Sequence, residues 1–337
     1  MKKIVYILGI ICAMTMQSCL DLEPKTQLAD TNYWKSPEHF KLFATQFYGW
    51  SADFRWLDDS QHADIRSDLF AGSTVNIYSN GTNSIPSSDK HYTDNYNRIR
   101  QVNTLLQQAD AYEQQADIAI SVGEARFFRA YCYFNLVRAF GEVPLVTYKI
   151  NDASEANIPK TTTDKIYEQI DTDLKTAEES LPETWSTEYT GRLTWGAARS
   201  LHARTYMMRS DWDNMYKAST DVINKGLYNL KTPYNEIFTD DGENSGGSIF
   251  ELQCTATAAL PQSDVIGSQF CEVQGVRGAG QWDLGWGWHM ATQLMADAYE
   301  TGDPRKNATL LYFRKTDDEP ITPENTNEPY GESPVSP

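Results

Sequence analysis

The sequence lacks the short motifs that point directly to catalysis or to nucleotide binding. It contains no GxSxG, no Walker loop, no GxGxxG and no HExxH. Cysteine and histidine are scarce, with five of each; no CxxC pair occurs, and the histidines are scattered along the chain. A zinc site and a disulfide scaffold therefore have no support. We expect no catalytic residue, no metal site and no cofactor, and a protein that is not an enzyme.

Basic residues are also few. The chain has 29 Lys and Arg against 46 Asp and Glu, which gives a formal net charge of −17. A chain this acidic is a poor candidate for nucleic acid, because phosphate binding needs a basic face. The many acids do not indicate a glycosidase either, because chance pairs of carboxylates are unavoidable at this abundance.

Long hydrophobic runs are absent except for one near the N-terminus. Lys2 and Lys3 precede an apolar stretch from Ile4 to Met14, which is too short for a stable membrane anchor and is typical of an export signal. Met16-Gln17-Ser18-Cys19 follows as a loose form of the bacterial lipoprotein box. We interpret residues 1–18 as a lipoprotein signal peptide and Cys19 as the lipid-bearing residue, so that the lipid alone contacts the membrane. The alternative is an ordinary secretory signal with an incidental cysteine.

Helical periodicity is what the sequence has in abundance. Periodic stretches are 36–47, 92–106, 117–140, 163–181 and 194–224. The stretch 117–140 is apolar almost all round, which predicts a helix buried on several sides, with Arg126, Arg129 and Arg138 paired to acids of neighbouring helices. Residues 194–224 are similar to a tetratricopeptide unit, with Trp212 wedged into the turn between two helices.

The remaining stretches are poorer in helical pattern. Residues 51–90 predict a long loop, and long loops in compact domains are often functional. After residue 230 we expect a strand at 249–253 and a Gly- and Trp-rich stretch at 267–288. Met290, Leu294 and Ala298 then predict a helix that ends at Gly302-Asp303-Pro304-Arg305. From Asp317 onward there are six acids, no base and five prolines, a composition that cannot fold by itself. The expected fold is mainly α, with tetratricopeptide-like helical hairpins and a loop-rich second lobe containing little β.

Several segments, in order, resemble the SusD/RagB family. They are "NYNRIRQVNTLL" (95–106), "EARFFRAYCYFNLVRAFGEVPLV" (124–146), which resembles the family's signature helix and turn, "GRLTWGAARSLHARTYMMRSDWDNMYKASTDVINKGLYNL" (191–230), "SIFELQ" (248–253) and "DAYETGDPR" (297–305). The resemblance runs from Cys19 to about residue 315. Family members usually continue with further helices, so we expect this chain to be truncated at its C-terminus.

The resemblance implies an organisation and a function. It implies a tether at 19–35, a helical domain at 36–230, the start of a C-terminal lobe at 231–316 and a tail at 317–337. Members of the family are surface lipoproteins of Bacteroidetes that cover a SusC-like TonB-dependent transporter in the outer membrane. We therefore expect an outer-membrane protein that faces the cell exterior, binds oligosaccharide and hands it to that transporter. Peptide binding of the RagB type and a protein adaptor without a small ligand remain alternatives.

Candidate ligand-binding residues lie in two stretches. Trp282, Trp286 and Trp288 stand among glycines, where indole rings could stack on the C–H faces of sugars. The equal alternative is that these rings pack the core of the second lobe. By resemblance, the first long loop contributes Asp64, Arg66, Asp68 and Tyr78 to the ligand surface. For each charged residue of that loop, a salt bridge within the loop is the commoner role.

Overall fold

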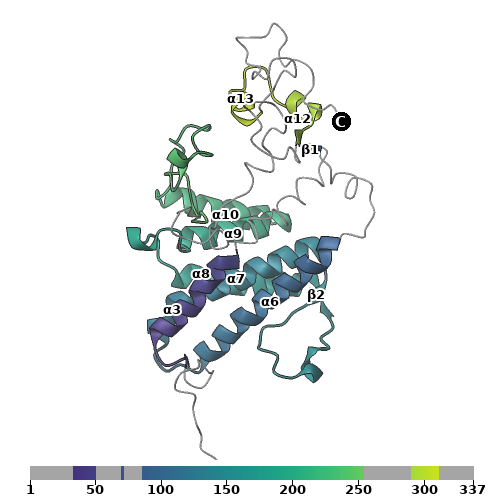
Figure 1. Cartoon of the computed structure of the whole chain (residues 1–337), viewed down its shortest axis with the longest axis vertical. Helices are drawn as coiled ribbons and strands as arrows, with labels where there is room; N and C mark the ends of the chain where they lie inside the picture. The colour runs from purple at the N-terminus through teal and green to yellow at the C-terminus, as the bar shows by residue number, and fades with distance from the viewer. Residues whose placement is uncertain (1–32, 51–69, 72–85, 254–289, 311–337) are drawn as a thin grey trace, which may run out of the picture.

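The computed structural model describes residues 33–50, 70–71, 86–253 and 290–310 (Figure 1). The α-helices are α3 (Pro37–Thr45), α6 (Pro86–Asp110), α7 (Gln115–Phe140), α8 (Thr163–Ser180), α9 (Trp195–Met208), α10 (Trp212–Asn224), α12 (Gln293–Asp297) and α13 (Arg305–Thr309). The short strands are β1 (Phe70–Ala71), β2 (Val143–Pro144), β3 (Lys160–Thr161) and β4 (Met290–Ala291), and the 3-10 turns are η2 (Ala153–Ala156), η3 (Thr187–Tyr189) and η4 (Asp240–Gly242). The prediction of a mainly α fold with little β is confirmed. No helix within these ranges is long and apolar enough to cross a membrane.

Helix α7 lies at the centre of the helical part. It packs against α3 and α6 on one side and against α8 on the other, while α9 packs on α8 and α10 on α9 (Figure 1). Its buried residues occupy all sides, as the nearly uniform apolar sequence predicts. Gly141 ends the helix at φ +70°, a conformation that L side chains rarely adopt.

The predicted hairpin at 194–224 is confirmed as α9 and α10. The Thr194 hydroxyl accepts a hydrogen bond from the Ala197 N–H and caps α9, and the Asp211 carboxylate accepts from the Asn214 N–H and caps α10. The expected position of Trp212 is wrong, because its side chain is 57% exposed instead of wedged into the turn.

Three predicted element boundaries need correction. Helix α6 begins at Pro86, inside the stretch expected to be loop, because proline is well tolerated in the first turn of a helix. Residues 249–253 form no strand; the Asn244 side-chain amide exchanges two hydrogen bonds with that of Gln253, at 3.0 Å each, so local contacts replace a sheet ladder. Met290 lies in β4, and the helix expected there starts only at Gln293.

A buried ion pair joins α7 to α8. The Arg129 guanidinium donates from Nε to Asp173 Oδ2 at 2.8 Å and from Nη2 to Asp173 Oδ1 at 2.7 Å. Arg126, one turn earlier on α7, donates to the same carboxylate at 2.9 Å. The predicted pairing of these two arginines with an acid of a neighbouring helix is confirmed, and Arg138 donates to Asn135 at 2.9 Å.

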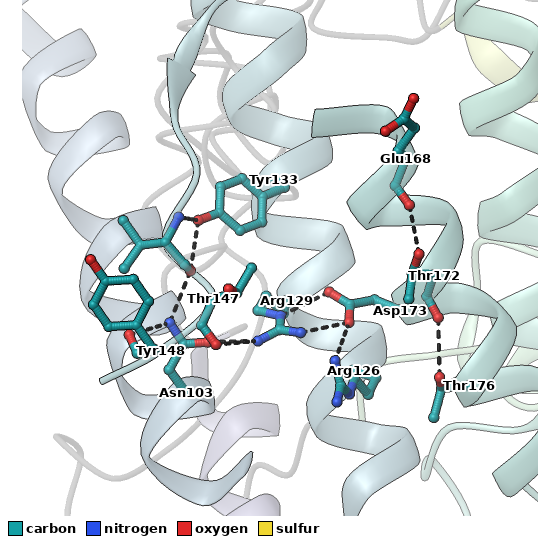
Figure 2. Close-up of polar contacts among 11 residues, drawn as sticks. Asn103, Arg126, Arg129, Tyr133, Thr147, Tyr148, Glu168, Thr172, Asp173 and Thr176 are labelled. Atoms are coloured by element: carbon teal, nitrogen blue, oxygen red, sulfur yellow. Dashed lines mark hydrogen bonds and ion pairs between the residues drawn. The ribbon is translucent and has the colours of Figure 1, made fainter. Parts of the chain in front are cut away.

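The same arginine fastens the chain that follows α7. Arg129 Nη1 donates to Asn103 Oδ1 at 2.8 Å and to the Thr147 carbonyl at 3.2 Å, and Asn103 donates to the Val146 carbonyl at 2.9 Å. The Tyr133 hydroxyl accepts from the Val146 N–H at 2.7 Å and donates to its carbonyl at 2.9 Å. Figure 2 shows these contacts converging on the segment after β2. This segment is therefore positioned by buried side chains of α6 and α7.

Candidate ligand-binding region

The predicted site residues lie outside the described residues. Asp64, Arg66 and Asp68 fall in 51–69, Tyr78 falls in 72–85, and Trp282, Trp286 and Trp288 fall in 254–289. Cys19 also lies outside the described ranges. The structure does describe the residues that flank these stretches, and their contacts decide how far apart the candidates can be.

Strands β1 and β4 connect the two candidate stretches. They pair antiparallel, with Phe70 opposite Ala291 and Ala71 opposite Met290. β1 interrupts the first loop between 69 and 72, and β4 follows directly on the Trp-rich stretch. The backbone therefore joins two stretches that are separated by about two hundred residues of sequence.

Covalent geometry limits the distance between the candidates. Asp68 precedes Phe70 by two residues, and Trp288 precedes Met290 by two residues. A chain advances at most about 3.5 Å per residue, and paired strand residues have Cα atoms about 5 Å apart. The covalent connection to the paired strands therefore limits how far apart these two candidates can lie.

The other ends of these stretches lie over one face of α7. Trp50, the last residue before 51–69, packs with its ring centroid 5.5 Å from that of Phe128. Phe250, four residues before the start of 254–289, has its ring centroid 6.5 Å from that of Phe127 and 6.4 Å from that of Tyr48. The two neighbouring phenylalanines of α7 therefore support both chain segments.

A buried carboxylate holds this face together. Glu124 of α7 is fully buried and accepts a hydrogen bond from the Tyr48 hydroxyl at 2.6 Å and one from Arg192 Nε at 2.8 Å. The Tyr48 hydroxyl also accepts from the Leu193 N–H at 2.9 Å. We call Tyr48, Glu124, Arg192 and Leu193 the Glu124 cluster. It joins the end of the α3 segment, α7 and the loop before α9.

The electrostatics of the cluster follow from burial and pairing. Burial raises the pKa of Tyr48 well above its ordinary value, and the neighbouring negative charge of Glu124 raises it further. Burial alone would lower the pKa of Arg192, but the hydrogen bonds and charge of Glu124 raise it above the ordinary value. The phenol therefore stays neutral and the guanidinium stays charged, so the cluster is a structural ion pair with a hydroxyl bridge.

The loop before α9 also contacts the segment that leads into 254–289. Gly191 has φ +88°, and a Cβ atom at this position would overlap the Gln253 side chain. Trp185 Nε1 donates to the Leu193 carbonyl at 2.8 Å and fixes the other side of the loop. Glycine at 191 therefore suits both the positive φ and the close approach of the Gln253 side chain, which lies against the loop before α9.

The Glu124 cluster was missed by reasoning from the sequence. The available signal was an acid in the middle of a largely apolar helix, whose other acid, Asp117, lies in the first turn, since a buried carboxylate needs a partner. Among the residues that the structure describes, no group of three or more His, Cys, Asp or Glu is placed to hold a metal ion.

Comparison with known proteins places the chain among SusD-like proteins. A family model described as starch-binding and associating with the outer membrane matches residues 19–207. SusD-like protein P2 of Formosa agariphila is 30% identical over 174 residues, which cover 50% of this chain and 34% of that protein. A SusD-like protein of Bacteroides ovatus is 22% identical over 329 residues, which cover 90% of this chain and 58% of that protein.

A solved structure shares the fold. Surface glycan-binding protein A from Bacteroides thetaiotaomicron, in complex with laminarihexaose, matches with a TM-score of 0.65 at 21% identity, over 80% of this chain and 62% of that chain. The chain spans less than two thirds of the length of each of these three proteins.

Proposed function

Because the chain belongs to the SusD-like family, whose members are described as starch-binding and associating with the outer membrane, we propose that it binds oligosaccharide at the outer membrane. The ligand site lies where the first loop meets the Trp-rich stretch, between the helical domain at 36–230 and the lobe that begins at 231. Trp282, Trp286 and Trp288 supply stacking surfaces, and Asp64, Arg66, Asp68 and Tyr78 supply polar contacts.

The pairing of β1 with β4 is the observation that carries this proposal. It supports one shared site, because both candidate sets adjoin the same two-stranded sheet. A site of this kind combines aromatic faces with hydroxyl-binding groups, which is the chemistry that sugars present. The net charge of −17 favours neutral glycans over polyanionic ones, since like charges repel.

The proposal extends to anchoring and to a partner. Lipid on Cys19 tethers the protein. Asp21 and Glu23 directly after it resemble the surface-export signal of Bacteroidetes lipoproteins and direct the protein to the cell exterior, where the ligand passes to a SusC-like barrel. A tether raises the effective concentration of two membrane proteins, so a modest interface between them suffices.

Single Trp→Ala substitutions at 282, 286 and 288 test the site. Stacking contributes on the order of 1 kcal/mol per ring, so at least one variant is expected to bind glycan several-fold to tens-fold more weakly with its melting temperature nearly unchanged. Calorimetry with maltohexaose, laminarihexaose and an anionic oligogalacturonate measures the affinity. Trp212→Ala is the matched control, because this exposed indole lies on α10 and its loss leaves binding intact.

Three outcomes contradict the proposed site. Core indoles would cost about 3–5 kcal/mol on truncation, so unfolding of all three variants argues for the packing role. Binding of a peptide mixture, such as a casein digest, with no binding of any glycan favours the peptide-binding alternative. No binding of either class supports the adaptor.

Two experiments test the lipid anchor and the partner, and the first uses the variant Cys19→Ala. The variant is expected to leave the membrane fraction for the soluble fraction, because loss of the acyl chains removes the only membrane contact proposed. Purification of the wild-type protein from outer membranes in mild detergent is expected to recover a transporter barrel in stoichiometric amount. A variant that stays in the membrane fraction rules out the lipid anchor, and a wild-type protein recovered alone argues against the partner.

A further inference from the structure

His202 sits between two carboxylates in the interface of α8 and α9. Its side chain is buried, with the residue 4% exposed. Nδ1 lies 2.7 Å from Glu178 Oε1, and Nε2 lies 3.3 Å from Asp171 Oδ1. The two acids are seven residues apart on α8, so they occupy one face of that helix and bracket the imidazole ring from two sides.

Further charges surround this trio. Arg209, the C-cap of α9, donates to both oxygens of Asp171, at 2.9 and 2.8 Å. Arg199 of α9 contacts Glu178 at 3.1 Å and Asp221 of α10 at 2.6 Å. Three helices thus contribute three acids and two arginines, and a positive charge on the histidine between them balances the set.

Two tyrosine rings also contact this set of charges. The Tyr206 ring stacks on the imidazole at a centroid distance of 4.4 Å and an interplanar angle of 17°. Tyr167 of α8 lies under the Arg209 guanidinium at 4.8 Å, and Arg138 of α7 is the further charge that acts on this tyrosine. The imidazole itself is buried, so its partners are these protein groups, whereas the Asp171 side chain keeps 32% exposure to solvent.

Nδ1 hydrogen-bonds with Glu178, whereas Nε2 faces Asp171 at 3.3 Å without hydrogen-bond geometry, so the contact with Asp171 is one between charges. Only the doubly protonated ring presents an N–H to both acids. An imidazolium donates from both nitrogens, whereas neutral imidazole donates from one and turns an acceptor lone pair toward the other carboxylate. Loss of the proton therefore replaces the attraction between one ring nitrogen and its carboxylate by a repulsion between two lone pairs. It also leaves the three acids, two arginines and neutral histidine with a net negative charge.

We propose that His202 is a protonation-dependent clamp that fastens the α9–α10 hairpin to α8 when its ring carries two protons. The hairpin is held tightly in mildly acidic solution and loosely in alkaline solution. The clamp is a property of the helical part alone and does not rest on glycan binding.

The direction of the pH effect follows from the neighbouring charges. Burial would lower the pKa of His202, but Asp171 and Glu178 raise it above the ordinary 6.5. A raised folded-state pKa gives stabilisation that is fully present below 6.5 and is lost as the pH rises through the folded value. Arg209 and His202 lower the pKa of Asp171 despite its burial, so this acid stays ionised throughout that window.

Hydrogen exchange on the full chain tests the clamp. Exchange protection of α9, corrected for the pH dependence of intrinsic exchange, is compared with that of α6 at about pH 5.5 and about pH 8.5, on either side of histidine titration. In the wild type, α9 is expected to lose several-fold more protection than α6 at the higher pH. In His202→Gln, which cannot titrate, that differential loss disappears.

His39→Gln is the matched control, because it makes the same substitution at a histidine on α3, outside the charged set. It keeps the wild-type pH response. The proposal is overturned if α9 and α6 of the wild type lose protection equally between the two pH values. This measurement decides the question even where His202→Gln fails to fold. A variant that folds and keeps the wild-type differential overturns the proposal as well.

Discussion

Asparagine in place of Asp173 is expected to lower the free energy of unfolding by about 3–5 kcal/mol. The Asp173 side chain is fully buried and receives Arg129 through two hydrogen bonds and Arg126 through a third. Asparagine keeps the size of the side chain and one acceptor oxygen, so the change removes charge and leaves shape intact. The Arg129 side chain, 2% exposed, is then left as a buried cation without its carboxylate.

The consequence extends beyond the pair. Arg129 also holds Asn103 and the Thr147 carbonyl, so loss of its carboxylate loosens the segment after β2. Urea unfolding at neutral pH measures the loss of unfolding free energy. The midpoint of the transition is expected to fall, while the slope of the free energy against urea concentration stays unchanged.

Asp221→Asn is the matched control for this prediction. Its side chain is 43% exposed and contacts Arg199 at 2.6 Å, so solvent screening limits the expected loss to about 0.2–1 kcal/mol. Equal unfolding midpoints for Asp173→Asn and the control would show that burial of the ion pair contributes nothing.

The helical part of this fold could be predicted because its residues repeat with helical period over long stretches. The sequence of α7 is apolar on every side and carries arginines at 126 and 129, which together indicate a central helix with charged partners on its neighbours. Gly141 marks the end of that helix, because its φ of +70° suits glycine.

The sheet contacts could not be predicted, because a two-residue strand has no period to detect. Nothing in Phe70-Ala71 specifies Met290-Ala291 as its partner; that pairing depends on the whole chain between them. The failure at 249–253 has the opposite cause. The apolar pattern there is real, since Ile249 packs on the core. Hydrogen bonds from the Asn244 N–H to the Glu251 carboxylate and from the Asn244 side chain to Gln253 replace the expected strand partner.

Trp212 shows a further limit of sequence reasoning. The turn of the helical hairpin was located correctly, but Trp212 is the first residue of α10 and its side chain is exposed instead of wedged into the turn. Which face of a hairpin is covered depends on what packs next to it, and local sequence carries no information about that. The same limit applies to the candidate ligand residues outside the described ranges. Their sequence does not say which surface they face, and only the pairing of β1 with β4 limits how far apart they lie.

Glutamine in place of Glu124 is expected to destabilise the protein by about 3 kcal/mol, because the Arg192 side chain, 12% exposed, loses a buried counter-charge. Tyr48→Phe keeps the ring and removes the hydroxyl bridge to Glu124 and to the Leu193 N–H. Its expected cost is about 1–3 kcal/mol, the range for leaving buried polar groups unpaired. Tyr148→Phe is the matched control, since this tyrosine is 49% exposed.

The double variant distinguishes a cluster from a set of separate contacts. Because Tyr48 and Arg192 share one carboxylate, the combined loss in Glu124→Gln, Tyr48→Phe is expected to be smaller than the sum of the single losses by about 0.5–3 kcal/mol. Urea midpoints of the four proteins give the coupling.

The same cluster fixes residue 48, near the start of the first loop, and the loop before α9, where Gly191 contacts Gln253. Tyr48→Phe should therefore also weaken glycan binding, whereas Tyr148→Phe should not. Strictly additive stability losses with unchanged affinity would show that these contacts act independently and position nothing.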